Sequence, residues 1–195
     1  MAYRNGTYVA FHAGGTSDPT ASDIKYYNTM KMWDANKTID FDFTDSHDKT
    51  SAVRDSSKRA TLERALRSRL NDSKNFVLIL TARTKNDTDW VPFEIRHGID
   101  NCDLPIIAVY PDYRVILQPH ALAAYWPSAF ATRIGNGSAK VIHIPFAKAP
   151  LLAAISHFSV HSEQPNGSNI IYTAHSQRSW GLLQPYEGEQ NQRSN

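Results

Sequence analysis

Cysteine, long apolar runs and clustered positive charge are all scarce in this chain. Cys102 is the only cysteine among 195 residues, which excludes an internal disulfide and a cysteine-based zinc site. No apolar stretch approaches the roughly 20 residues of a membrane-spanning helix, and the polar residues 1–6 do not resemble a signal peptide. We therefore expect a cytoplasmic protein that does not associate with a membrane.

Positive charge is too thinly spread to indicate a nucleic-acid partner. The formal net charge is +2, and no run of Lys or Arg forms a basic patch. Hydrophobic residues make up 41% of the chain and charged residues 21%, values typical of a globular protein with a substantial core. The length suits one α/β domain plus an extension.

Short apolar runs alternate with helical patterns as far as residue 158. Strands are predicted at residues 7–11, 39–43, 76–80, 105–109 and 139–144. Helices are predicted at residues 24–33, about 56–70, from 90 onward, and 148–158. This alternation favours a doubly wound α/β fold with a mainly parallel sheet and helices on both faces. We expect one domain over residues 1–161 and a polar, partly disordered C-terminal extension over residues 162–195.

The crossover helix between the third and fourth predicted strands carries the clearest candidate for chemistry. Trp90 and Glu94 are four residues apart and share one helix face, beside a predicted buried stripe of Val91, Ile95 and Ile99. Glu94 is expected in the first helical turn, near the sheet edge where open α/β folds bind ligands. Unpaired N–H groups favour an ionised carboxylate there, so both a catalytic role and ordinary helix capping explain this residue.

Two polar loops follow the first and second predicted strands. His12 leads into Gly14 and Gly15, which allow the backbone to approach a ligand but match neither the dinucleotide fingerprint nor the P-loop. A plain turn explains these glycines equally well. Asp45 and His47 belong to an acidic cluster whose spacing fits no metal-binding motif. We expect a hydrogen-bonded loop at the rim of a ligand site, and no bound metal.

Together these features resemble the TIR (Toll/interleukin-1 receptor) domains, and among them the bacterial TIR-like branch that includes the TIR proteins of Thoeris antiphage defence. The resemblance rests on the Trp90-x-x-x-Glu94 motif, the opening strand, and residues 36–48, and it covers roughly residues 7–158. The Pro-Gly loop with which receptor TIR domains contact adaptors has no counterpart after the second strand.

The resemblance implies a flavodoxin-like α/β/α fold with a central five-stranded sheet, and an enzyme that cleaves the nicotinamide–ribose bond of NAD. It implies a cyclic or otherwise substituted ADP-ribose product that activates a separate effector protein. NAD would be the substrate, and no cofactor or metal would be required. A phage-derived trigger and a homo-oligomer are compatible with this family.

By the same resemblance, Glu94 is the essential carboxylate of the site. The candidate substrate-binding residues are Phe11, His12, Ala13, Trp33, Asp45, His47 and Trp90. Two alternatives stay open: a non-catalytic TIR-like assembly module, and a nucleotide-binding protein similar to nucleoside deoxyribosyltransferases, which also can use a glutamate on a helix.

Overall fold

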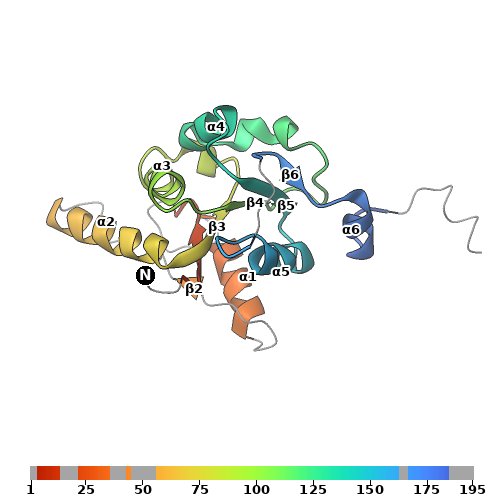
Figure 1. Ribbon diagram of the computed structural model, residues 1–195, viewed down its shortest axis with the longest axis horizontal. Coiled ribbons are helices and arrows are strands. Elements are labelled where there is room, and N and C mark those ends of the chain that lie inside the picture. The colour runs from red at the N-terminus through yellow and green to blue at the C-terminus, as the bar shows by residue number, and fades with distance from the viewer. Residues whose placement is uncertain (1–3, 14–21, 36–42, 45–55, 163–166, 185–195) are drawn as a thin grey trace, which may run out of the picture.

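The computed structural model describes residues 4–13, 22–35, 43–44, 56–162 and 167–184. Its centre is a six-stranded sheet in the order β2-β1-β3-β4-β5-β6, and every neighbouring pair of strands is parallel (Figure 1). The strands are β1 (Gly6–Ala10), β2 (Phe43–Thr44), β3 (Ser73–Ile79), β4 (Ile106–Tyr110), β5 (Val141–Pro145) and β6 (Ile170–Ile171).

Four of the five predicted strands are confirmed to within three residues at each boundary. Of the predicted second strand only Phe43 lies among the described residues, where it begins β2. The first five strands follow the 2-1-3-4-5 order of flavodoxin-like folds, which confirms the predicted fold class. The sixth strand was not predicted, and it comes from the chain beyond residue 161.

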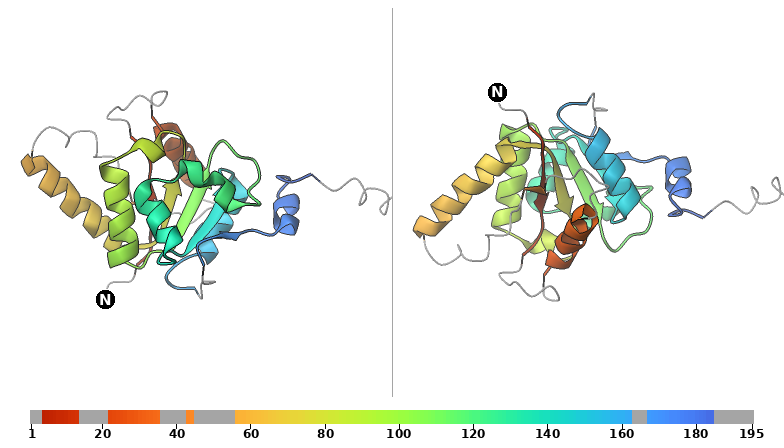
Figure 2. Two further views of the ribbon diagram at one scale, coloured as in Figure 1. Left: turned by 90° about the horizontal axis from the view of Figure 1, so that it is seen from above. Right: turned by 90° about the horizontal axis from the view of Figure 1, so that it is seen from below.

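Helices cover both faces of the sheet (Figure 2). On one face lie α2 (Ser56–Asn71), α3 (Trp90–Arg96) and α4 (Ser128–Gly135), and on the other lie α1 (Ile24–Ala35) and α5 (Lys148–His157). The helices predicted near 24–33, 56–70 and 148–158 are thus confirmed. The remaining helical segments are η2 (Thr84–Asn86), η3 (His97–Asn101), η4 (Pro119–Tyr125) and α6 (Ala174–Ser179).

The pleat of β1 divides its side chains between two separate hydrophobic clusters. Tyr8 and Ala10 belong to the cluster beneath α2, α3 and α4, whereas Val9 and the following Phe11 belong to the cluster beneath α1 and α5. Successive side chains of a strand point to opposite faces, so this parity decides which helix layer each residue meets.

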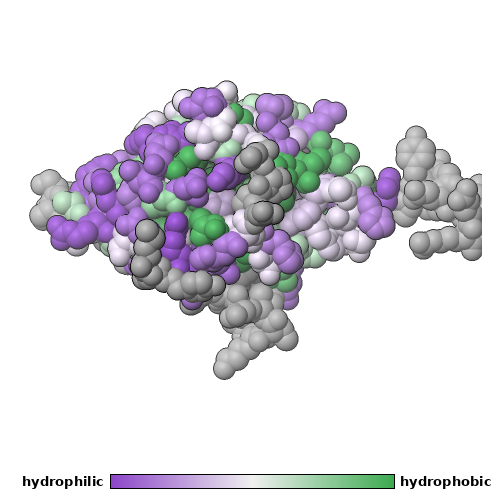
Figure 3. All heavy atoms as spheres, in the orientation of Figure 1, coloured by the Kyte–Doolittle hydropathy of each residue, from purple (hydrophilic) through white to green (hydrophobic). Residues whose placement is uncertain are grey.

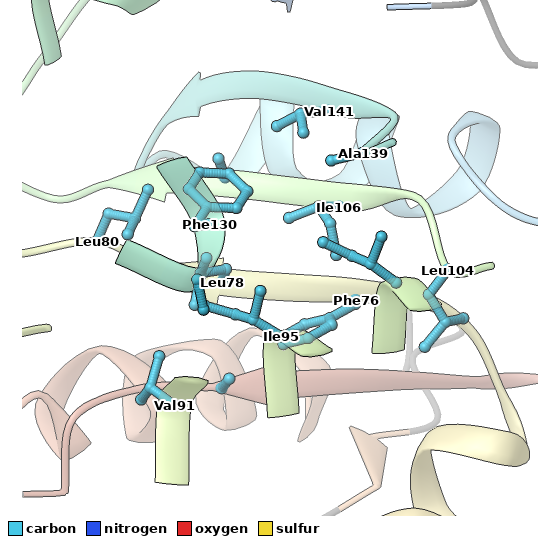
Figure 4. Close-up of a cluster of buried hydrophobic side chains, with 14 of the residues drawn as sticks. Phe76, Leu78, Leu80, Val91, Ile95, Leu104, Ile106, Phe130, Ala139 and Val141 are labelled. Carbon is cyan, nitrogen blue, oxygen red and sulfur yellow. The ribbon is translucent and has the colours of Figure 1, made fainter. Parts of the chain in front are cut away.

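The predicted buried stripe is confirmed, and it continues from α3 into η3. Val91 and Ile95 are fully buried and Ile99 is 7% exposed. Figure 4 shows Ile95 beside Phe76 of β3, and Val91 belongs to the same cluster. At Gly98 an added Cβ would lie 2.7 Å from a ring carbon of Phe76. A glycine is therefore required for η3 to approach the sheet this closely.

Residues 167–184 are joined to the domain by buried polar contacts. An imidazole nitrogen of His143, on β5, lies 2.9 Å from the backbone oxygen of Ser168. Gln177 of α6 is 2% exposed and hydrogen-bonds to both backbone groups of Ile116. This part of the chain thus completes the sheet edge.

The outer surface over α2 is mostly hydrophilic (Figure 3). It carries the exposed side chains of Arg64 and Arg67, as expected for a solvated helix face. Among the residues that the structure describes, no helix is both long and apolar enough to cross a bilayer.

Candidate functional site

The candidate site lies at the carboxyl ends of β1 and β3, the two strands between which the strand order reverses. Open α/β sheets bind ligands at such a switch point. Three elements meet there: the chain after β1, the chain between β3 and α3, and α3 itself. The predicted site residues found on these elements are Phe11, His12 and Ala13 after β1, and Trp90 and Glu94 on α3.

Glu94 lies in the second turn of α3 and is fully buried, which corrects the prediction of a first-turn position at the edge of the stripe. The helix begins at Trp90, and the carboxylate that serves its first amides belongs to Asp87. Oδ1 of Asp87 accepts the N–H groups of Asp89 at 3.0 Å and Val91 at 3.4 Å. Glu94 is therefore not the capping residue of this helix.

The partner of the Glu94 carboxylate is a phenol from the middle of β1. The hydroxyl of Tyr8 donates a hydrogen bond to Oε1 of Glu94, and both side chains are fully buried. Burial, followed by the charge of Glu94 and this hydrogen bond, raises the pKa of Tyr8 well above its usual value. Tyr8 consequently stays protonated and remains a permanent donor to the carboxylate.

Trp90 is almost fully buried, one helical turn before Glu94, with 8% of its surface exposed. The guanidinium of Arg59 lies over its ring, 4.8 Å from the centroid. Two hydrogen bonds of 2.6 and 3.0 Å to Asp89 hold that guanidinium in place, with a third contact of 3.2 Å to Glu63. In this conformation Arg59 covers one face of the indole, so that face is closed to a sugar or base.

Phe11 does not lie beside Glu94. Its ring is 1% exposed and stacks on Tyr27 of α1, with centroids 5.3 Å apart, on the opposite face of the sheet. The ring of this candidate substrate-binding residue is therefore packed away from the Glu94 carboxylate. The cause is strand parity, because Tyr8 and Phe11 differ by an odd number of positions.

His12 and Ala13 follow β1 and are both half-buried. Nδ1 of His12 lies 3.1 Å from Oδ2 of Asp87, and the two side chains are 26% and 11% exposed. This contact ties the end of β1 to the residues that start α3. Ala13 instead packs against the cluster beneath α1.

Trp33 lies in the α1 layer, away from the Glu94 face of the sheet. Its ring stacks on Phe146, just after β5, with centroids 5.1 Å apart. Phe146 also lines a cavity of about 390 Å³ at the carboxyl ends of β4 and β5. The predicted rim residues Asp45 and His47 lie outside the described residues, as do Gly14 and Gly15.

A second polar network at this edge was not predicted. The carboxylate of Asp23, which is 2% exposed, accepts a hydrogen bond of 2.8 Å from the Thr81 hydroxyl, and the Thr84 hydroxyl lies 3.2 Å away. Burial raises the pKa of Asp23, and these hydrogen bonds oppose that effect only in part. The N–H of Asp23 also donates to the backbone oxygen of His12 at 3.1 Å. In the sequence, Asp23 is recognisable only as a polar residue before a helix.

The arrangement suits a cationic or charge-developing ligand group. Within the described ranges, no group of three or more His, Cys, Asp or Glu side chains could hold a metal. The site instead contains a buried carboxylate at Glu94 and an imidazole–carboxylate pair at His12 and Asp87. Fixed negative charge near the end of a sheet can stabilise positive charge as it forms.

The part of the chain that carries this site matches a known family. Residues 8–115 match the family model described as the Thoeris protein ThsB, TIR-like domain. The match covers more than half of the chain and runs from β1 to just past β4. Tyr8, His12, Asp87 and Glu94 all fall within it.

Proposed function

The chain belongs to the Thoeris ThsB TIR-like family, and from that premise we propose that it cleaves the nicotinamide–ribose bond of NAD. The ADP-ribosyl group would then pass to an acceptor other than bulk water. The product would be a cyclic or substituted ADP-ribose that activates a separate effector protein. The observation that carries the proposal is the buried Glu94 carboxylate, held by the Tyr8 phenol beside the switch point of the sheet.

The proposed chemistry matches what this carboxylate can supply. Nicotinamide is a cation in NAD and leaves as a neutral base that takes the bonding electron pair. Positive charge therefore develops on the ribose, as in other glycosidic cleavages. An anion fixed in a site of low polarity stabilises that charge strongly, and it needs no reorganisation during the reaction. Tyr8 would keep the Glu94 carboxylate oriented toward the sugar.

The full burial of Glu94 has a consequence for regulation. A carboxylate with no exposed surface cannot touch a ribose until the side chains above it move. The Trp90 ring and its Arg59 contact are one turn nearer the edge of the sheet and are the groups expected to move. Low turnover of the resting protein follows from this closed arrangement, as suits an enzyme that would otherwise drain NAD.

The full burial of Glu94 also fits an alternative function, that of a non-catalytic TIR-like module that works by assembly. In that case Glu94 would serve only to anchor α3 against β1 through Tyr8. The two functions differ in whether NAD disappears.

The deciding experiment incubates the purified protein with NAD, with and without a lysate of phage-infected cells, and identifies the products by mass spectrometry. We expect nicotinamide together with an ADP-ribose derivative that differs from ADP-ribose itself. ADP-ribose as the only second product would indicate a hydrolase. Unchanged NAD under both conditions would indicate the assembly module. A parallel incubation with a deoxynucleoside and a second base detects a deoxyribosyltransferase.

A further inference from the structure

His12 does more than line the candidate site, because its imidazole contacts a carboxylate, that of Asp87. Nδ1 of His12 and Oδ2 of Asp87 are 3.1 Å apart, although the residues are 75 positions apart in the chain. The other carboxylate oxygen of Asp87 accepts the N–H groups of Asp89 and Val91 at the start of α3. The orientation of the Asp87 carboxylate is thus fixed from two sides.

Asp87 determines which nitrogen of His12 carries the proton. Although burial favours the neutral carboxyl, the hydrogen bonds from His12 and from backbone N–H groups outweigh it and lower the pKa of Asp87. An ionised carboxylate can only accept hydrogen bonds, so Nδ1 of a neutral His12 must carry the hydrogen. The lone pair is then on Nε2, which has no hydrogen-bond partner within the described part of the chain.

We infer that His12 is the general base that deprotonates the acceptor hydroxyl in the ADP-ribosyl transfer, with Asp87 holding it in the required tautomer. This inference rests on the proposed NAD cleavage. The acceptor is a hydroxyl group, from a ribose of the same molecule or from a second ligand. Its oxygen forms the new bond to C1 of the nicotinamide ribose, and its proton moves to Nε2 of His12. The resulting imidazolium is stabilised by Asp87 and later releases the proton to solvent.

This assignment separates two half-reactions. Departure of nicotinamide needs the negative charge of Glu94 but no proton transfer, because the leaving group is neutral. Capture of the ribosyl cation by a hydroxyl does need a base. Without that base, the cation can still recombine with nicotinamide and regenerate NAD. Exchange of labelled nicotinamide into NAD therefore reports the first half-reaction alone.

The test measures both quantities in the full-length chain for His12→Gln and Asp87→Asn. We expect each variant to form the ADP-ribose derivative on the order of 10²-fold more slowly, the usual contribution of a general base. Exchange of labelled nicotinamide should stay within about threefold of the parent rate, since binding and cleavage do not depend on a base. In Asp87→Asn the amide can donate to Nδ1, which moves the ring hydrogen to Nε2 and removes the lone pair there.

Matched controls are His175→Gln on α6 and Asp72→Asn after α2, both exposed and outside the candidate site. Both should show parental product formation and exchange. If His12→Gln and Asp87→Asn form product at the parental rate, His12 is not the base. If either variant stays folded but loses exchange together with product, its residue serves binding or cleavage, and the inference is also wrong. A parent protein with neither exchange nor product would overturn the proposed NAD chemistry itself.

Discussion

Replacing Tyr8 by Phe removes the hydrogen bond from the phenol to the Glu94 carboxylate. The change removes the phenol oxygen but keeps the ring, which packs edge-on against Phe76 with centroids 5.3 Å apart. Hydrogen bonds to charged groups contribute roughly 1.5–3 kcal/mol to stability. We expect Tyr8→Phe to lower the free energy of unfolding by that amount, which for a domain of this size is a loss of about 3–12 °C in melting temperature.

The measurement is urea denaturation of the parent and the variant at neutral pH, followed by circular dichroism. A shift of the midpoint with an unchanged slope would show that the folded state has lost stability. Tyr113→Phe is the matched control, because its hydroxyl donates 3.2 Å to the neutral hydroxyl of Tyr125. A bond between neutral groups should contribute only about 0.5–1.5 kcal/mol.

A double-mutant cycle with Glu94→Gln sharpens the test. In the Gln background the phenol faces a neutral amide, so the loss from Tyr8→Phe should shrink by about 1 kcal/mol or more. Turnover of NAD by Tyr8→Phe should fall on the order of tenfold, because the carboxylate is less firmly oriented. A loss below about 0.5 kcal/mol in both backgrounds would refute the charged hydrogen bond as a source of stability.

Two further predictions concern the core. Burial lowers the pKa of His143 to about 4, below its ordinary value of 6.5, so the unfolded chain takes up the proton first as the pH falls. The contribution of His143 to the free energy of unfolding should therefore be complete above pH 6.5 and fall by about 3 kcal/mol by pH 4. When the free energy from urea denaturation is plotted against pH, the plot should be flatter for His143→Gln than for the parent. Gly98→Ala should lower the unfolding free energy by about 1–3 kcal/mol, because the new methyl group would meet Phe76 at 2.7 Å. Gly135→Ala, with nothing within 4 Å of the added Cβ, should be neutral or slightly stabilising, and equal losses at the two glycines would contradict the packing argument.

Local patterns were sufficient to predict most of the fold. Continuous apolar runs identified the buried parallel strands, and the spacing of Val91, Ile95 and Ile99 identified the face of α3 that meets the sheet. The two-residue β6 could not be predicted, because so short a segment has no periodicity. It exists because its backbone pairs with β5.

The site was predicted less completely, since its essential contacts join distant parts of the chain. Tyr8 and Glu94 are 86 positions apart, and no local pattern links a tyrosine in a strand to a glutamate on a helix. The pairing of His12 with Asp87 depends in the same way on how β1 lies beside β3. The face on which Phe11 packs also depends on the register of its strand, because a shift of one position moves a strand residue to the other face.

The central claim is that the Glu94 carboxylate drives cleavage of NAD, and the most direct test compares nicotinamide release by Glu94→Gln with that by the parent protein. The amide keeps the size of the side chain and removes its charge. The account predicts a rate lower by on the order of 10²–10³, with circular dichroism and the helix content near those of the parent. Asp72→Asn, an exposed residue after α2 and outside the candidate site, should release nicotinamide at the parental rate. Parental release by a folded Glu94→Gln variant would contradict the account and leave Glu94 as a structural partner of Tyr8.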